Sequence, residues 1–394
     1  MSAIFEKASE LKEFMTKARR HFHQNPELAH KEFETTKYIK ERLAEMNVEL
    51  LDVEFNTGCI AIIKGEMAGP DVITAIRADI DALPIIEQTG LAYTSQNEGI
   101  MHACGHDGHT ACLLGVAKLL SSMKDKFSGT AMLIFQPAEE GLRGAKTMLD
   151  KGAFEKCQPD EIIALHAFPY VPAGKIGIMP AKAMASSDSF TVKVIGKGGH
   201  GARPNESINP ISAAASMVSA ISNIISSQIS TFDSAVISIC TIHSGVAANV
   251  IPQEASFSGT VRCLENDNRK IIKGFIEQKV SGISQSFGCE YEFEYKEGVS
   301  SLTNSKEVNE KVYKAAADSI GEENIMILEN ASMGSEDFSD FIMATGGNGV
   351  MFRLGSGNAD NTSAALHNHL FDFNDEALPY GASVMSQYIL NKHK

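Results

Sequence analysis

The chain has 394 residues, of which 43% are hydrophobic and 21% are charged, and its formal net charge at pH 7 is −14. This length exceeds that of a typical single hydrophobic core, so we expect two domains. The acidic balance, with no basic cluster to offset it, excludes nonspecific binding to nucleic acid or to an anionic membrane and favours a small-molecule partner.

The chain begins with Glu and Lys mixed among apolar positions at helical spacing, and it lacks the uninterrupted apolar core of a signal peptide. No stretch approaches the ~18 apolar residues that a membrane-spanning helix needs. The seven cysteines are an odd number without short paired spacings, so they do not indicate a disulfide framework. We therefore expect a cytoplasmic protein.

The first half of the chain alternates helical and strand patterns. Good helix formers indicate two helices within residues 2–47, separated at Asn25-Pro26. Residues 107–123 are apolar nearly all round, as in a helix packed inside an α/β layer. Short β-rich runs occupy residues 59–64, 72–77, 132–135 and 162–165. This alternation predicts an α/β fold with a mixed sheet covered by helices on both faces.

The pattern changes after Lys182. The predicted order is then strand, helix, strand, strand, helix and strand, which is the ferredoxin-like arrangement, in residues 190–195, 210–227, 235–242, 255–264, 268–287 and 290–295. Longer helices and one buried strand, residues 349–354, follow. We therefore predict a larger domain formed by residues 1–182 and 298–394, with a smaller α+β domain of residues 183–297 inserted into it.

The first predicted helix of the inserted domain has a smooth surface. Its residues 211–227 are rich in Ala, Ser and Ile, and such a face suits packing against a partner subunit. Because homodimers are the commonest soluble assemblies, we expect a homodimer through this domain, or a higher homo-oligomer.

Polar side chains follow several of the predicted strands. They are Asp79 and Asp81 after residues 72–77, Glu139 and Glu140 after residues 132–135, and His166 after residues 162–165. Because ligands of open α/β sheets bind beyond the carboxyl ends of the strands, residues that are distant in sequence can converge there. Together with Cys104 and His106, in the segment MHACGHDGH, these residues predict a metal-dependent active site.

Cys104 and His106 offer a thiolate and an imidazole, which are good ligands for zinc and other divalent transition metals. The single glycine between them lets the backbone turn sharply. One alternative is that the pair is incidental. Another is a cysteine nucleophile oriented by His106, but a thiolate held by a metal is no longer free to attack.

Glu139 and Glu140, in QPAEEG, place two like charges at the end of a strand. A buried pair of this kind is costly unless a cation compensates it, whereas a solvated surface pair is the ordinary alternative. Neighbouring side chains of an extended chain point in opposite directions, so one carboxylate can bind metal while the other faces the substrate. The natural division is one ligand and one general base.

The remaining candidates have structural alternatives. His166 is either a metal ligand or a core histidine satisfied by a backbone carbonyl. In AALHNHLFDFND, one histidine of the pair His367 and His369 can reach the site while the other caps the loop. Asp79 and Asp81 are either turn residues or carboxylates that orient metal-bound histidines.

Seven segments of the chain, taken together, resemble one known family. MHACGHDGHT, QPAEEG, LHAFP, GKGGHGARP, GVAANVIP, GSEDF and LHNHLFDFND occur in this order. They resemble the aminoacylase and hippurate hydrolase branch of the dinuclear metallopeptidase family, which also includes indole-acetyl-amino-acid hydrolases and, more distantly, carboxypeptidase G. The likeness covers nearly the whole chain.

The resemblance implies a zinc-exopeptidase-like catalytic domain with two divalent ions and an inserted lid domain used for dimerisation. It assigns the general base to Glu139 and the ligands to Cys104, His106, Glu140, His166 and His367. Zinc or manganese is expected, with cobalt or nickel as alternatives. The wider family has His-x-Asp where this chain has Asp79-Ile80-Asp81, which leaves the role of Asp79 open and makes Asp81 an orienting carboxylate. His369 remains a lesser candidate, and a bridging role for Cys104 is left open.

The inserted domain contains GKGGHG, which fits the glycine-rich pattern of dinucleotide-binding proteins. The residues that follow, 202–205, do not open a helix, and a pyrophosphate site needs that helix N-terminus, so nucleotide binding is rejected. In related proteins this loop presents its histidine, here His200, to the substrate, often from the other subunit. Asn249 and Arg262 are assigned to the substrate carboxylate, with a surface salt bridge as the alternative for Arg262.

The implied reaction is hydrolysis of an N-acyl-L-amino acid, such as an N-acetyl or N-benzoyl derivative, to a carboxylate and a free amino acid. A metallo-dipeptidase or aminopeptidase is the alternative within metal enzymes. The residues also leave open a thiol-dependent hydrolase and a metal-binding protein without catalytic activity.

Overall fold

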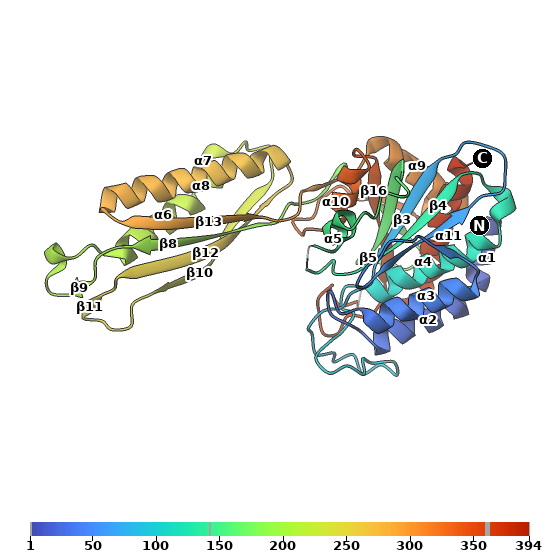
Figure 1. Ribbon diagram of the computed structural model, residues 1–394, viewed down its shortest axis with the longest axis horizontal. Helices are drawn as coiled ribbons and strands as arrows, with labels where there is room; N and C mark the ends of the chain where they lie inside the picture. Colours follow the sequence, from blue (N-terminus) through green and yellow to red (C-terminus); the bar gives the residue numbers. More distant parts are fainter. Residues whose placement is uncertain (1, 142, 359–362, 394) are drawn as a thin grey trace. The chain divides into compact units, whose positions relative to one another are not determined.

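The computed structural model describes residues 2–141, 143–358 and 363–393. It divides into two compact units, which are coloured along the sequence in Figure 1. The first unit consists of Met1–Ala181, Thr303–Asn330 and Asp337–Lys394, and the second consists of Lys182–Leu302 and Ala331–Glu336. The second unit is therefore an insertion within the chain of the first.

The first unit is built on an eight-stranded mixed sheet with the order β1-β2-β4-β3-β5-β16-β6-β15. Its strands are β1 (Glu49–Leu50), β2 (Cys59–Lys64), β3 (Ile73–Asp79), β4 (Thr130–Gln136), β5 (Glu161–Pro172), β6 (Ile176–Ile178), β15 (Ile325–Ile327) and β16 (Gly349–Gly357). The four central strands β4, β3, β5 and β16 run parallel, and β2 joins β4 antiparallel. The carboxyl ends of β3, β4 and β5 therefore lie at one edge of the sheet.

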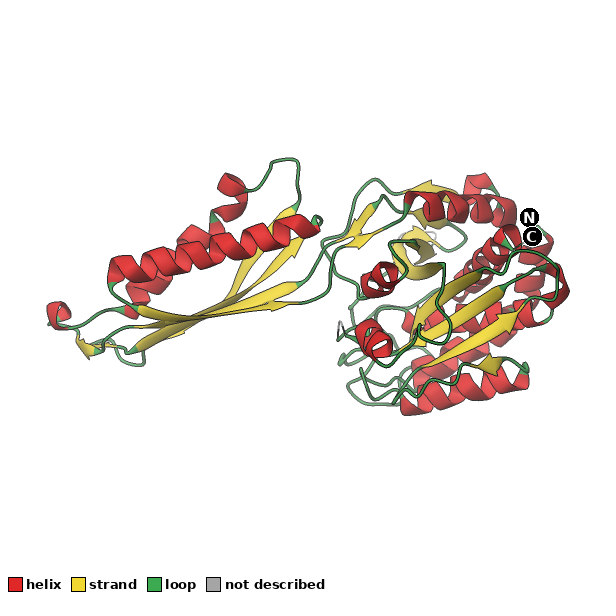
Figure 2. Cartoon of the chain, turned by 45° about the horizontal axis from the view of Figure 1, so that its top comes forward, coloured by secondary structure: helices red, strands yellow, loops and turns green. Residues whose placement is uncertain are grey.

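Helices cover both faces of this sheet (Figure 2). On one side of the sheet a group of helices shares one hydrophobic core: α1 (Ala3–Glu10), α2 (Lys12–Gln24), α3 (Phe33–Glu45), α4 (His106–Ser121), α9 (Lys306–Ile320) and α11 (Leu378–Lys392). Helices α3, α4 and α9 contact the strands, whereas α1 and α2 pack mainly on other helices. The other face packs against the short helices α5 (Gly144–Asp150) and α10 (Phe338–Ala344). This arrangement confirms the predicted α/β fold with a mixed sheet.

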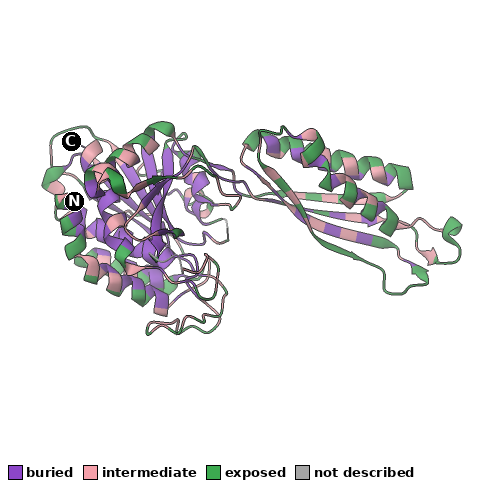
Figure 3. Ribbon diagram, turned by 180° about the vertical axis from the view of Figure 1, so that it is seen from behind, coloured by how far each residue is buried: buried purple, intermediate pink, exposed green. Residues whose placement is uncertain are grey.

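The amino-terminal helical region differs from the prediction of two helices. Three helices occur, because the backbone leaves the helical conformation at Leu11, between α1 and α2. Leu11 is neither a glycine nor a proline, so the sequence carries no signal for this break. Nearly every residue of helix α4 is buried, as its apolar sequence predicts, and Figure 3 colours each residue by its burial.

The second unit has a four-stranded antiparallel sheet with the order β10-β12-β8-β13. Its main elements in chain order are β8 (Asp188–Ile195), α6 (Pro210–Ser222), α7 (Ile224–Gln228), β10 (Ala235–Ser244), β12 (Glu254–Cys263), α8 (Asn266–Phe287) and β13 (Glu290–Glu297). Alternate residues of β8 and β12 are buried against α6 and α8, in a core that includes Phe190, Phe257 and Ile276. The predicted helix at 210–227 is interrupted at Asn223, which ends α6.

Two small ribbons complete the fold. β9 (Gly199–His200) pairs with β11 (Val250–Ile251), and β7 (Lys182–Met184) pairs with β14 (Leu302–Thr303). In the part of the chain that the structure describes, single turns of 3-10 helix lie at Lys124–Lys126, Pro204–Glu206, Glu322–Asn324 and Asp375–Ala377. Within the described residues, no helix has the length and apolar character needed to cross a membrane.

Candidate metal centre

The carboxyl edge of the central sheet gathers the candidate ligands of the first unit. Asp79 is the last residue of β3, and Glu139 and Glu140 lie in the turn after β4. His166 lies inside β5 and not after its end, because β5 continues to Pro172 by pairing with β16. The parallel arrangement of β3, β4 and β5 therefore brings these three segments together.

Cys104, His106 and His166 form one buried group of possible ligand atoms, all within 4.8 Å of one another. The Cys104 Sγ lies 3.6 Å from the His166 Nε2. Gly105, between the first two, has a φ of +86°, and a Cβ there would lie 2.8 Å from the Cβ of Ala167. Glycine is therefore required for the turn that directs both side chains to the same point.

Cys104 also belongs to a second group, with Glu140 and His367. The His367 Nε2 lies 3.3 Å from the Glu140 Oε1, and the His367 N–H donates to the carbonyl of Ala103 at 2.7 Å. His367 has a φ of +61°, in the left-handed region. The Cys104 thiol thus belongs to two groups of ligand atoms. The imidazole of His367 completes the second group, and its backbone is held by the bond to Ala103.

The donor atoms present fit divalent transition metals. Among the described residues, the buried His106 Nε2 and Glu140 Oε1 make no hydrogen bond of acceptable geometry, and they lie 3.9 Å apart. A buried polar atom without a partner costs roughly 1–3 kcal/mol, which a bound cation would offset. Sulfur, imidazole nitrogen and carboxylate oxygen together suit zinc, manganese, cobalt or nickel.

The protonation of the ligands depends on burial and on their mutual contacts. Burial raises the pKa of the Cys104 thiol and holds the pKa of His166 well below its usual range. The close approach of Cys104 and Glu140 raises the pKa of His367 to about 10. Burial, the largest single effect, would lower the pKa of His106, but its contacts with Asp79, Cys104 and Asp81 together outweigh burial and raise this pKa. Metal binding must therefore release protons from Cys104, His106 and His367.

Asp81 holds two of the candidate segments in place. Its two carboxylate oxygens accept from the N–H groups of Glu139 and Glu140, each at 3.0 Å. The His106 Nδ1 lies 2.9 Å from the Asp81 carbonyl, which can only accept, so Nδ1 carries the proton. This contact leaves the His106 Nε2 free to bind a cation.

Asp79 is engaged on both oxygens. Its Oδ1 lies 2.6 Å from the His109 Nδ1, and its Oδ2 accepts from the Arg77 Nη1 at 2.6 Å. The His109 Nε2 accepts from the N–H of Ala167 at 2.7 Å, so both ring nitrogens of His109 are occupied. These contacts favour an anchoring role for Asp79 over metal ligation. The sequence offered His109 only as the last histidine of MHACGHDGH.

Glu139 lies beside the ligands with most of its side chain buried. Its Oε2 lies 3.9 Å from the His106 Nε2, and its side chain is 6% exposed. The preceding residue, Ala138, has a φ of +56°, and its N–H donates to the Glu32 Oε1 at 2.8 Å. Glu32 thus supports this turn, although no sequence pattern singled it out.

Glu32 should make the stability of the metal-free protein fall as the pH rises. Burial raises the pKa of its carboxyl from 4.5 to about 7, a shift worth about 3 kcal/mol. The folded state therefore holds a proton that the unfolded state has already released, so this contribution is fully present below pH 4.5 and is lost as the pH rises through about 7. Urea unfolding of the metal-free protein between about pH 5 and pH 8 measures this loss.

The variant Glu32→Gln mimics the protonated side chain and should flatten this part of the pH profile. The matched control is Glu34→Gln, because Glu34 is exposed on the same segment. A Glu32→Gln profile as steep as that of the wild type would contradict the assignment.

The candidate residues of the inserted domain lie in the second unit. His200, on β9, is exposed, and its Nδ1 accepts from the N–H of Ala202 at 3.0 Å. Asn249 precedes β11, the partner of β9, and its carbonyl accepts from the N–H of Gly201 at 2.8 Å. Arg262 lies apart on β12, where its Nη1 donates to the Ser187 hydroxyl at 2.5 Å. His200 and Asn249 therefore share one ribbon, and Arg262 does not.

The lesser candidate His369 is exposed, and its carbonyl accepts from the N–H of Gln88 at 2.9 Å.

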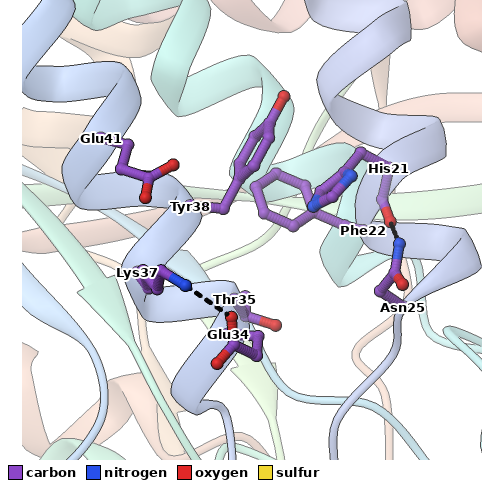
Figure 4. A pocket seen from close by; sticks show the side chains of 8 residues that line it. All are labelled: His21, Phe22, Asn25, Glu34, Thr35, Lys37, Tyr38 and Glu41. Atoms are coloured by element: carbon purple, nitrogen blue, oxygen red, sulfur yellow. Dashed lines mark hydrogen bonds and ion pairs between the residues drawn. The ribbon is translucent and has the colours of Figure 1, made fainter.

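A separate surface pocket of about 260 Å³ lies on helices α2 and α3 (Figure 4). Within it the ring of His21 stacks on Tyr38, with centroids 4.0 Å apart. None of the candidate ligands lines this pocket, so the metal centre remains the site with convergent chemistry.

Residues 75–391 match the model of peptidase family M20/M25/M40. The chain is 39% identical over 371 residues to N-acetylcysteine deacetylase of Bacillus subtilis (strain 168), with 94% of this chain and 93% of the relative covered. It is 37% identical over 376 residues to hippurate hydrolase of Campylobacter jejuni, with 95% of each covered. A solved Bacillus subtilis structure, described as a dinuclear metal-binding peptidase of family M20, has a TM-score of 0.85 at 34% identity and covers 97% of this chain and 98% of that one.

Proposed function

The chain belongs to peptidase family M20/M25/M40, and from this premise we propose that it hydrolyses N-acyl-L-amino acids to a carboxylate and a free amino acid. It is a hydrolase of amide bonds, like its named relatives. The observation that carries the proposal is Cys104, which is common to two groups of ligand atoms. The carboxylate of Glu139 beside them supports a catalytic centre.

We assign the ligands of two divalent ions to Cys104, His106, Glu140, His166 and His367. Cys104 is the candidate bridge, because it belongs to both ligand groups. Zinc and manganese are the first candidates, and cobalt or nickel would suit the same donors. When bound, the ions lower the pKa of a water molecule and polarise the amide carbonyl.

The protein side chains would then complete the reaction. Glu139 takes the proton from the attacking water and delivers it to the leaving amine. His200, from this subunit or its partner, stabilises the oxyanion of the tetrahedral intermediate. Asn249 and Arg262 are the candidates that hold the substrate carboxylate, and the guanidinium of Arg262 suits that group.

A substrate panel tests this proposal against a dipeptidase or aminopeptidase. Those enzymes would need an acidic group to hold the free amine of the substrate. The names of two relatives, N-acetylcysteine deacetylase and hippurate hydrolase, favour an acylated amine. Protein loaded with zinc or manganese should cleave N-acetyl and N-benzoyl amino acids and leave the matching dipeptides intact. Faster cleavage of the dipeptides would overturn the proposal.

A metal-binding protein without activity and a thiol-dependent hydrolase would each behave differently from the proposed enzyme. The former would have no use for Glu139 as a base, and it would cleave no member of the panel. The latter would remain active in the presence of a chelator. Burial of Cys104 raises the pKa of its thiol, which opposes its use as a free nucleophile.

We further propose that the protein is a cytoplasmic homodimer that associates through the second unit. All seven cysteines are free, which suits a reducing compartment. Among the described residues β10 is an edge strand that pairs only with β12, and Val236 and Ile242 on it are exposed. An unpaired, apolar edge favours association with a second copy.

The variant Ile242→Lys should convert the dimer to a monomer. Ile242 is 55% exposed, so a charged side chain there disturbs an edge contact without disturbing the core. Sedimentation velocity measures the change against the 42.5-kDa mass of one chain. The matched control is Lys193→Gln on the central strand β8, which should leave the assembly unchanged. A monomeric wild type would refute the proposed assembly.

A further inference from the structure

Arg19, on α2, is completely buried and contacts carboxylates from two separate segments. Its Nε donates to the Asp107 Oδ2 at 2.8 Å, and its Nη2 donates to the Asp372 Oδ1 at 2.8 Å. Its Nη1 donates to the Asp375 Oδ1 at 3.4 Å. One guanidinium therefore joins chain segments that are more than 250 residues apart in sequence.

Both of these segments carry ligands that the proposed function assigns. Asp107 directly follows His106 at the start of α4, and Asp372 lies five residues after His367. Arg19 thus connects the turn that contains Cys104 and His106 with the loop that presents His367. The helix α2 that carries it packs beside α4 (Figure 1).

The two segments differ in how firmly they are held without Arg19. Asp107 also accepts from the N–H of Gly108 and lies 2.8 Å from the His23 Nδ1, within the first turn of α4. Asp372 has a weaker additional contact, from the Tyr93 hydroxyl at 3.2 Å. Asp372 therefore depends on Arg19 more than Asp107 does, and Arg19 adds a side-chain link to the backbone bond that His367 makes with Ala103.

The backbone of this loop is otherwise irregular. Between β16 and α11, as far as the structure describes that segment, the only helical element is the single 3-10 turn Asp375–Ala377. Phe371 and Phe373 are fully buried, so their apolar packing holds the middle of the loop against the core. Apolar contacts have no preferred direction, and they do not orient the His367 side chain. Directional hydrogen bonds from a planar guanidinium can do so.

We propose that Arg19 is a positioning residue of the metal centre. It fixes the distance between the His367 loop and the Cys104–His106 turn, and a second ion can bind only at that distance. The inference rests on the proposed function, because it presumes the two-ion centre. Arg19 itself contacts neither ion nor substrate. Its loss should therefore weaken the ion on the His367 side and spare the ion held by His106 and His166.

The choice of variants must separate positioning from folding. Removing Arg19 leaves the Asp107 carboxylate buried and without its main cationic partner, which is strongly destabilising. Arg19→Lys keeps the charge but replaces the fork with a single ammonium that cannot reach all the carboxylates. Asp372→Asn is gentler, because the Asp372 side chain is 35% exposed and the Arg19–Asp107 pair remains.

The matched control is Arg20→Gln. Arg20 is the next residue on α2, and its side chain is 46% exposed and pairs with Asp375 at 2.8 Å. This variant removes an ion pair to Asp375, which Arg19 also contacts, but it leaves the hydrogen bonds of Arg19 to Asp107 and Asp372 in place. It should bind metal as the wild type does.

The experiment titrates metal-free protein with Mn²⁺ or Zn²⁺ alone, using calorimetry and elemental analysis, with circular dichroism and thermal unfolding to check the fold. The wild type should bind two ions. Asp372→Asn and Arg19→Lys should bind one ion normally and the other roughly 10–100-fold more weakly, as orienting groups around metal sites do when they are lost. Asp372→Asn should also keep the metal-free unfolding temperature of the wild type.

Two results would refute the positioning role of Arg19 but leave the proposed function intact. In one, folded Asp372→Asn binds both ions with wild-type affinity, and in the other it loses both ions equally. If Arg19→Lys fails to fold, Asp372→Asn decides the question. A wild type that binds no ion at all would refute the proposed function, and this inference with it.

Discussion

Glu139→Gln should lower kcat by roughly 10²–10⁴-fold while the protein keeps both metal ions. Gln has the shape of Glu but cannot take a proton from water at neutral pH. The backbone of residue 139 would still donate to Asp81, because that contact does not involve the side chain. Turnover of the best N-acyl substrate, with metal content from elemental analysis of the same sample, measures the effect.

The adjacent residue supplies the matched control. Glu140→Gln changes the same functional group one position along the same turn, but Glu140 is a proposed ligand whose Oε1 lies 3.3 Å from the His367 Nε2. This variant should lose metal as well as activity, because an amide is a weaker ligand than a carboxylate. Near wild-type turnover in Glu139→Gln, or loss of metal from it, would refute the base assignment.

Cys104→Ala should release at least one ion and abolish activity. Cys104 belongs to both groups of ligand atoms, so its removal deprives each group of its sulfur. The side chain is small and lies at the edge of the core, and the fold should survive its truncation. Metal counting by elemental analysis, together with circular dichroism, separates loss of metal from loss of structure.

Cys112→Ser is the control for this variant. Cys112 is also buried, but its Sγ faces the carbonyl of Leu378 at 3.6 Å and belongs to none of the ligand groups. A serine hydroxyl can donate to the same carbonyl. The control should retain both ions, and a Cys104→Ala protein with full metal content would contradict the shared-ligand assignment.

The side chains whose convergence at this edge of the sheet is easiest to predict from the sequence are those that follow strands. Asp79, Glu139 and Glu140 come at or after the ends of parallel strands, and the parallel order of β3 and β4 brings them to one edge. The sequence predicts His166 just after a strand, whereas it lies within β5, because β5 pairs with β16 as far as Pro172. The local sequence pattern therefore indicates which residues lie near a strand end. It does not indicate how long the strand is, because that depends on how far the partner strand continues.

The hydrogen bonds and ion pairs that hold the ligand-bearing segments in place cannot be predicted from the sequence, because the residues that they join have no fixed spacing along the chain. Arg19 and Asp372 are 353 positions apart, and Glu32 and Ala138 are 106 apart. Periodicity and turn signals act over a few residues and say nothing of such pairs. The break at Leu11 is a local feature, but it cannot be predicted either, because the residue is neither a glycine nor a proline and gives no signal of a helix end.

The backbone around the proposed ligands limits how far this protein can be made more heat-resistant. Among the described residues, the non-glycine positions with positive φ include Ala138 and His367, next to Glu139 and within the ligand set. Each such position costs on the order of 1–3 kcal/mol. A glycine at position 138 would relax the chain, but it would also loosen the orientation of Glu139, and a glycine at position 367 would remove a proposed ligand. Engineering for thermal tolerance should therefore leave these two positions as they are and seek gains elsewhere.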